Sequence, residues 1–167
     1  MTVKNVEKDP EKLTFRITSE FDASIDRVWQ LWSDPRQLER WWGPPTYPAT
    51  VVRHEFMPGG TVSYYMTGPE GDQHHGWWRI SSIDAPRRLE FEDGFADSDG
   101  KPNDEMPVTI SRVELTDEPG PRVRMTIESE FPSLQAMEQM IAMGMEEGII
   151  AALGQIDTLL VEKTPAS

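Results

Sequence analysis

Three histidines, His54, His74 and His75, are the residues of this chain that could exchange protons near neutral pH. His54 shares strand parity with Val52 and Phe56, so we expect its ring to point inward and to be a candidate proton shuttle. A hydrogen-bonded structural histidine is the alternative at the same position. His74 and His75 are adjacent on a predicted strand, where their rings diverge, so we predict no metal site.

Other kinds of chemistry have less support in the sequence. The chain has no cysteine, which excludes disulfides, thiolate zinc sites and a cysteine nucleophile. It contains no Gly-x-Ser-x-Gly motif and no glycine-rich phosphate loop between a strand and a helix. The acidic segment 93–105 lacks the spacing of a calcium loop, so we interpret it as a solvated loop or a lid. We therefore expect no cofactor, and no motif identifies the protein as an enzyme.

Aromatic and methionine side chains are the candidates for ligand contact. Trp78 is expected to face inward with Ile80, and several methionines fall on one predicted C-terminal helix, where their flexible side chains could form an adaptable wall. Ordinary core packing is the alternative for all of them. The candidate ligand-binding residues are Trp41, His54, Tyr64, Met66, Trp78, Phe91, Met125, Met137, Ile141 and Met145.

The elements that would position these residues follow from periodicity. Residues 12–21 alternate between apolar and polar, as in a half-buried strand. Ile25, Val28, Trp29 and Trp32 recur at helical spacing, and a second short helix can start at Pro35. Further strands are expected at 49–57, 61–67, 74–83, 87–95, 106–117 and 123–131. A long helix of roughly 25–29 residues follows, beginning near residue 134.

Length and order of elements define the expected architecture. The chain has 167 residues, which favours one domain. We expect a flexible N-terminus over 1–11, a single domain over 12–163 and a tail over 164–167. The predicted fold class is α+β, with an antiparallel sheet of about six or seven strands and with helices set apart from it, the last of them long. Two short helices would follow the first strand.

Three stretches of the sequence resemble one known family. They are Ile25–Pro44, the Pro58–Gly60 turn before Tyr64–Met66, and Gly76–Ile80 before Pro86–Phe91. They are similar to the bacterial activator-of-Hsp90-ATPase-homologue C-terminal type, within the START/Bet v 1-like (SRPBCC) superfamily. The resemblance extends over about residues 12–163. It implies a helix-grip fold, in which a curved antiparallel sheet surrounds the long C-terminal helix. It also implies a hydrophobic ligand cavity between the two, but no single activity.

Charge narrows the range of partners. Sixteen basic and 29 acidic residues give a net charge of −13, which argues against nucleic acid and anionic membranes as partners. No window of about 18 apolar residues exists, so we predict no membrane span. The N-terminus has no apolar core of a signal peptide, and the expected location is the cytoplasm.

Three functional hypotheses remain open from the sequence. The first is binding of a small apolar ligand in a cavity between the sheet and the C-terminal helix. The second is a cyclase-, aromatase- or hydrolase-like enzyme that uses the same cavity. The third is an interaction module, either co-chaperone-like or homodimeric, for which an outward-facing Trp77 and the glycines Gly144 and Gly148 are the motivation.

Overall fold

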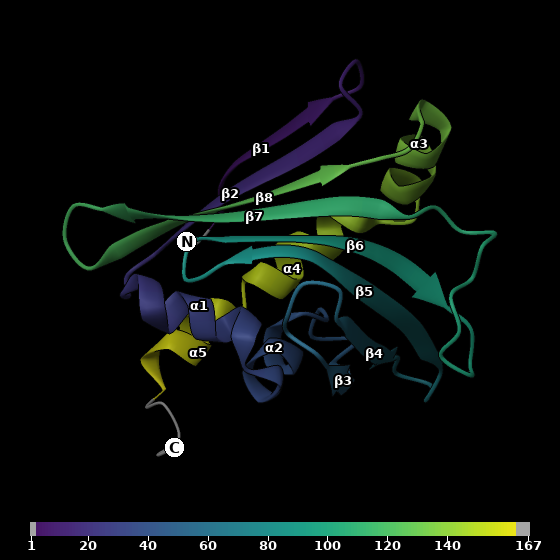
Figure 1. Ribbon diagram of the computed structural model, residues 1–167, viewed down its shortest axis with the longest axis horizontal. Coiled ribbons are helices and arrows are strands. Elements are labelled where there is room, and N and C mark those ends of the chain that lie inside the picture. Colours follow the sequence, from purple (N-terminus) through teal and green to yellow (C-terminus); the bar gives the residue numbers. More distant parts are fainter. Residues whose placement is uncertain (1–2, 163–167) are drawn as a thin grey trace.

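The computed structural model of the protein describes residues 3–162, and these form eight strands and five helices (Figure 1). The strands are β1 (Val3–Asp9), β2 (Thr14–Phe21), β3 (Ala49–His54), β4 (Thr61–Thr67), β5 (Gln73–Asp84), β6 (Arg88–Ala96), β7 (Thr109–Glu118) and β8 (Arg122–Glu130). The helices are α1 (Ile25–Ser33), α2 (Pro35–Trp41), α3 (Leu134–Ala142), α4 (Met145–Leu153) and α5 (Ile156–Val161).

All eight strands belong to one antiparallel sheet with the order β1-β2-β8-β7-β6-β5-β4-β3. The sheet is curved, and α4 passes behind its central strands while α1, α2 and α5 gather at one end (Figure 1). Strands alternate buried and less buried residues, as in Phe15, Ile17, Ser19 and Phe21 of β2. The predicted α+β helix-grip class is confirmed, with eight strands instead of six or seven.

Strand β1 corrects the expectation of a loose lead-in over residues 1–11. Its valines, Val3 and Val6, are three residues apart, which hides the alternation expected of a strand. A register shift between Val3 and Asn5 lets both valines pack against the core from the same strand. An ion pair between Lys8 and Glu146 also joins β1 to α4. Residues 1 and 2, and the predicted tail 164–167, lie outside the described residues.

Helices α1 and α2 form where the sequence predicts them, because both have capping residues. Ser24 Oγ accepts a hydrogen bond from Arg27 N at 3.2 Å, and Asp34 Oδ1 accepts one from Arg36 N at 2.9 Å. Pro35 occupies the first turn of α2, where its missing N–H costs nothing. The helical face predicted for α1 is buried, including Trp32, which is completely buried.

Helix α2 also covers the free edge of β3. Val51 N donates to Glu39 Oε2 at 2.9 Å, and Arg36 Nη2 donates to Val51 O at 3.0 Å. Both side chains therefore occupy backbone groups that β3 would otherwise offer to another strand. The next residue, Val52, lies at a register shift and is 68% exposed.

The C-terminal segment is helical over most of residues 134–161, but it is not one rod. Gly144 adopts φ +90°, a left-handed conformation that ends α3 and starts α4, and a second interruption follows at Gly154. The apolar periodicity persists across both interruptions, which is why the sequence predicts one long helix. The breaks change the direction of the helices as they cross the curved sheet (Figure 1).

The two glycines of this segment provide a matched stability test. Gly144→Ala should lower the free energy of unfolding by about 1–2 kcal/mol, because a Cβ atom disfavours its left-handed backbone. Gly148→Ala should raise it by up to about 1 kcal/mol, since this helical position has open space around a Cβ atom. Urea unfolding measures both changes. Equal effects of the two substitutions would contradict the assigned break.

Candidate functional site

An aromatic cluster lies on the concave side of the sheet, where α1 and α2 meet β4, β5 and β6. Trp78 stacks on Phe91 with ring centroids 4.0 Å apart, and Trp42 meets Trp78 edge-on at 4.8 Å. Such pairs contribute about 0.5–1.5 kcal/mol beyond their buried area. The cluster consists of Trp32, Trp41, Trp42, Tyr64, Trp78 and Phe91.

A phenol and a carboxyl group lie together within this cluster. Tyr64 Oη donates a hydrogen bond to Asp93 Oδ1 at 3.3 Å. Asp93 has the inward parity of Phe91 and is directly opposite Trp78 in the sheet. Gly76 faces Tyr64 on the neighbouring strand, where a Cβ atom would lie 2.5 Å from the phenol ring. A glycine is therefore needed for Tyr64 to lie across β5.

The surroundings of this pair change its acid–base properties. Burial raises the pKa of Asp93 to about 7, and the hydrogen bond from Tyr64 offsets part of that rise. Burial raises the pKa of Tyr64 well above its usual value, and the neighbouring Asp93 carboxyl raises it further. Asp93 is half-buried next to aromatic rings. Its carboxyl changes charge near neutral pH.

Two indole N–H groups lie beside this pair. Trp42 Nε1 and Trp78 Nε1 are buried and make no close hydrogen bond among residues 3–162. Side-chain hydrogen bonds from both indoles lower the pKa of Tyr64, so the acceptor that they face is its hydroxyl oxygen. A phenol oxygen has two lone pairs and can accept from both indoles while it donates its own proton to Asp93. The cluster therefore links two indoles, a phenol and a carboxyl that can take up or release a proton.

His54 lies outside this cluster, at the junction of β3 and α1. The register shift at Val52 turns His54 inward opposite Val62, so the predicted direction is reached through a bulge. Its Nε2 donates to Trp32 O at 3.1 Å, and its ring stacks on Phe56 with centroids 5.2 Å apart. Burial lowers the pKa of His54. These contacts are those of a structural histidine, and its role as a proton shuttle stays a prediction.

The other predicted ligand residues separate into three groups. Trp41, Tyr64, Trp78 and Phe91 belong to the aromatic cluster, where Trp41 Nε1 donates to Leu31 O. Met125 and Met137 are buried in the core, and Met125 Sδ accepts from Trp32 Nε1. Met66, Ile141 and Met145 are partly buried and pack against the core from its margin.

Two members of the site, Trp42 and Asp93, were absent from the predicted ligand residues. Asp93 was assigned to the acidic loop that follows it, although Leu89, Phe91 and Asp93 share one strand parity. Continuing that alternation by one more step would have placed the carboxyl inside. Trp42 follows Trp41 directly, and the end of α2 allows both rings to reach the cluster.

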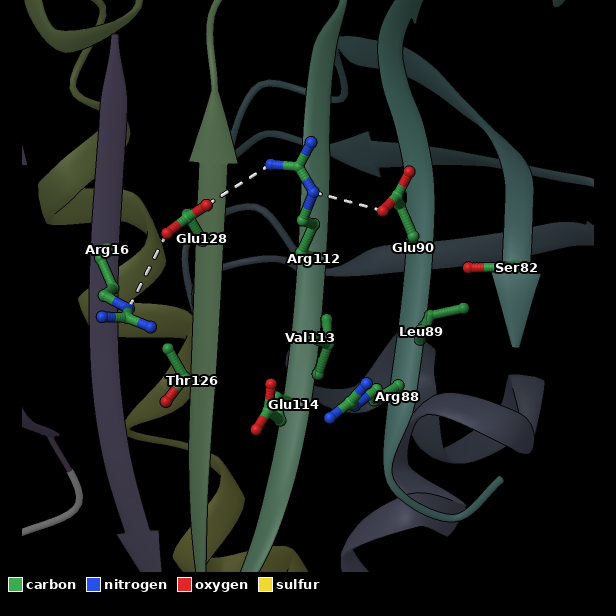
Figure 2. Close-up of a pocket in the computed structure, with 10 residues that line it drawn as sticks. All are labelled: Arg16, Ser82, Arg88, Leu89, Glu90, Arg112, Val113, Glu114, Thr126 and Glu128. Atoms are coloured by element: carbon green, nitrogen blue, oxygen red, sulfur yellow. Dashed lines mark hydrogen bonds and ion pairs between the residues drawn. The ribbon is translucent and has the colours of Figure 1, made fainter. Parts of the chain in front are cut away.

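The outer face of the sheet has a different chemistry. Its depression of about 410 Å³ crosses β2, β8, β7, β6 and β5 (Figure 2). Figure 2 shows Arg16, Glu128, Arg112 and Glu90 in a row across four of these strands, with Arg112 Nε 3.2 Å from Glu90 Oε2. A second depression of about 220 Å³ is also lined by charged residues. Neither depression contains a predicted ligand residue.

Trp77, for which the sequence suggested a contact with a second subunit, packs within its own chain. Its indole lies over Gly94, where a Cβ atom would approach to 2.5 Å, and its Nε1 donates to Phe95 O at 3.0 Å. The side chain is therefore only partly exposed. Its packing needs no second copy of the chain, and a homodimer stays a prediction.

The curved sheet and the helices on its concave face define a protein of the helix-grip, Bet v 1-like class. Within this class, the family model for "Activator of Hsp90 ATPase homolog 1-like protein" matches residues 22–161, and the chain belongs to that family. The family is associated with ligand binding or co-chaperone-like interaction, and the match does not distinguish the two.

Solved structures agree with the family assignment. A protein from Arthrobacter aurescens, determined by solution NMR, is 54% identical, with a TM-score of 0.92 over 99% of this chain and 96% of that chain. A crystallised protein from Mycobacterium smegmatis is 44% identical, with a TM-score of 0.89 over 98% and 99% of the two chains. The AHSA1 protein of Silicibacter pomeroyi is 21% identical, with a TM-score of 0.67 over 88% and 96%, and shows the fold alone. No curated protein matches this chain in sequence.

The described residues also bear on membranes and metals. Within residues 3–162, no helix has the length and apolar character needed to cross a bilayer. The same part of the chain has no group of three or more histidine, aspartate or glutamate side chains placed to bind a metal ion.

The raised pKa of Asp93 predicts a pH-dependent cost to stability. The folded protein holds the Asp93 proton up to about pH 7, whereas a free carboxyl loses it near its ordinary value of 3.8. The folded state therefore binds more protons between these values, and the free energy of unfolding falls as the pH rises. Asp93→Asn should raise stability at pH 8 by a few kcal/mol, at about 1.4 kcal/mol per pKa unit. This gain should disappear near pH 4.

Urea unfolding at a series of pH values checks this prediction. Glu92→Gln is the matched control, because Glu92 is the neighbouring acid on the opposite face of β6. The control should leave the pH dependence of stability as in the parent protein. A pH profile of Asp93→Asn parallel to that of the parent would contradict a buried carboxyl that titrates near neutral pH.

Proposed function

We propose that this protein binds a small, largely apolar molecule between the concave face of the sheet and its C-terminal helices. The observation that carries the proposal is a half-buried carboxyl, that of Asp93, within an aromatic interior that is partly exposed at Trp42 and Met66. Burial of a carboxyl at neutral pH costs free energy, so its position among aromatic rings needs a reason. Contact with a ligand supplies one.

The C-terminal helices offer a suitable wall for such a molecule. Met140, Ile141, Met145 and Ile149 pack against the core but remain partly exposed. Methionine side chains adapt to irregular shapes, and the break at Gly144 divides this wall between two helices. Apolar burial of about 25 cal/mol per Å² would supply most of the affinity. The enzyme and interaction hypotheses have no comparable observation in their favour.

A matched pair of variants tests this location. Ile141→Trp adds bulk to the partly buried wall and should reduce binding, whereas Met143→Trp adds the same bulk at a side chain that is 55% exposed. Each protein is purified from its native host and analysed by native mass spectrometry for a bound small molecule. We expect a ligand on the parent and on Met143→Trp, and at least about tenfold less on Ile141→Trp.

Folding of both variants is checked by circular dichroism, and binding is also measured by NMR titration with small molecules extracted from the host. The proposal fails if the parent protein carries no ligand and its spectrum does not change with the extract. It also fails if the two variants retain the ligand equally.

A further inference from the structure

Segment 138–151 of the C-terminal helices covers the core without a single fully buried residue. A helix that covers a sheet normally buries an apolar stripe. Parts of a protein with few buried apolar contacts are those that open most easily. This segment is therefore packed loosely, although five of its large apolar side chains contact the core: Met140, Ile141, Met145, Ile149 and Ile150.

Buried residues anchor the chain on both sides of this segment. Before it, Met137 of α3 is 2% exposed, and after it, Leu153 of α4 is completely buried. Just beyond Leu153, Gln155 Nε2 donates to Gly43 O at 2.7 Å, which ties the chain to the end of α2. The loosely packed segment is thus short and lies between two fixed ends.

One ion pair holds the middle of the segment to the sheet. Lys8 of β1 contacts Glu146 in the first turn of α4. Their side chains are 41% and 26% exposed, and ion pairs in contact with water are weak and easily broken. The other side-chain link from this segment within residues 3–162 is a 4.0 Å contact from Gln139 Nε2 to Met106 Sδ. A break in the helix lies between these two contacts, at the left-handed Gly144.

We propose that residues 138–151 form a lid over the interior between the sheet and the C-terminal helices, which bends at Gly144 and is held closed by the ion pair between Lys8 and Glu146. This inference rests on the proposed binding function and assigns the route by which a ligand reaches its site. Neither depression on the surface is lined by a residue of this segment, so entry beneath it requires a movement. An apolar molecule enters when the lid lifts, and it is enclosed when the ion pair forms again.

Hydrogen exchange measured by NMR tests the lid without any ligand. Amides of residues 145–151 should exchange at least about tenfold faster than those of β7 and β8, because they become exposed by local opening. Glu146→Gln should speed their exchange about two- to fivefold by removing the ion pair. Added salt should speed exchange in the parent protein but not in Glu146→Gln.

Glu147→Gln is the matched control for this exchange experiment. Glu147 is the neighbouring acid in the first turn of α4, and it forms no ion pair among residues 3–162. Its substitution removes the same charge near the helix N-terminus and should leave exchange within twofold of the parent, about the size of a helix-dipole effect. Equal effects of the two substitutions would overturn the lid, as would exchange in 145–151 as slow as in the sheet.

A crosslink across the ion pair tests whether the lid admits a ligand. The chain has no cysteine, so Lys8→Cys with Glu146→Cys provides the two thiols that a short bismaleimide can join. Uptake of Nile red, an uncharged apolar dye, should be at least about tenfold slower after crosslinking than before it. The control crosslink uses Arg40→Cys with Glu162→Cys, another ion pair outside the lid, and should leave uptake unchanged.

Circular dichroism checks that each crosslinked protein stays folded, and the exchange experiment decides the lid if one of them does not. Unchanged dye uptake after the crosslink between positions 8 and 146 would overturn the lid as the entry route. The absence of dye uptake by the parent protein would also overturn it. The host-purification experiment decides the proposed function separately, so the lid can fail while ligand binding stands.

Discussion

The packing of Trp32 between the helices and the sheet is the interaction on which the rest of this structure depends. Trp32 comes from α1, is completely buried, and contacts Trp41 of α2 at 4.8 Å and Phe91 of β6 at 6.3 Å between ring centroids. Its Nε1 donates to Met125 Sδ on β8, so one side chain touches both halves of the sheet. Since α1 and α2 are short helices with little stability of their own, this burial fixes their position. The position of α2 then brings Trp42 beside Trp78 and Tyr64, which completes the aromatic cluster.

Much of this arrangement could be predicted from the sequence where local pattern and tertiary environment agree. The alternation in β2 and the helical spacing in α1 both reflect one buried face, and both elements form as expected. The misassigned regions are those where one backbone irregularity changes the pattern. A register shift places Val3 and Val6 of β1 on one face, and the left-handed Gly144 divides a continuous apolar stripe into two helices. Asp93 was not predicted as a site residue, because it stands next to an acidic loop and has the same kind of side chain. Strand pairing with Trp78, and not the neighbouring sequence, sets the direction of its side chain.

The two faces of the sheet differ in whether their charged groups are paired in water or buried among aromatic rings. On the outer face, Arg112 contacts Glu90, Glu128 and Glu130, so the charges of adjacent strands are paired and remain in water. On the concave face, Tyr64 donates to Asp93 among aromatic rings, and the carboxyl is held where burial raises its pKa to about 7. Such an interior lowers stability and is retained where it has a use. The contrast separates a surface built for solubility from an interior suited to recognition.

The covered edge of β3 limits how two copies of this chain can associate through their sheets. Arg36 and Glu39 occupy the backbone groups of Val51 that a further strand would need, and the bulge at Val52 distorts the same edge. Growth of the sheet by intermolecular pairing is therefore obstructed on that side. At the opposite margin, β1 pairs only with β2 among the described residues, and no helix side chain blocks its backbone in a comparable way. Strand pairing between intact molecules is thus limited to β1 of one copy with β1 of another, and this isologous contact leaves no free edge from which a fibre could continue.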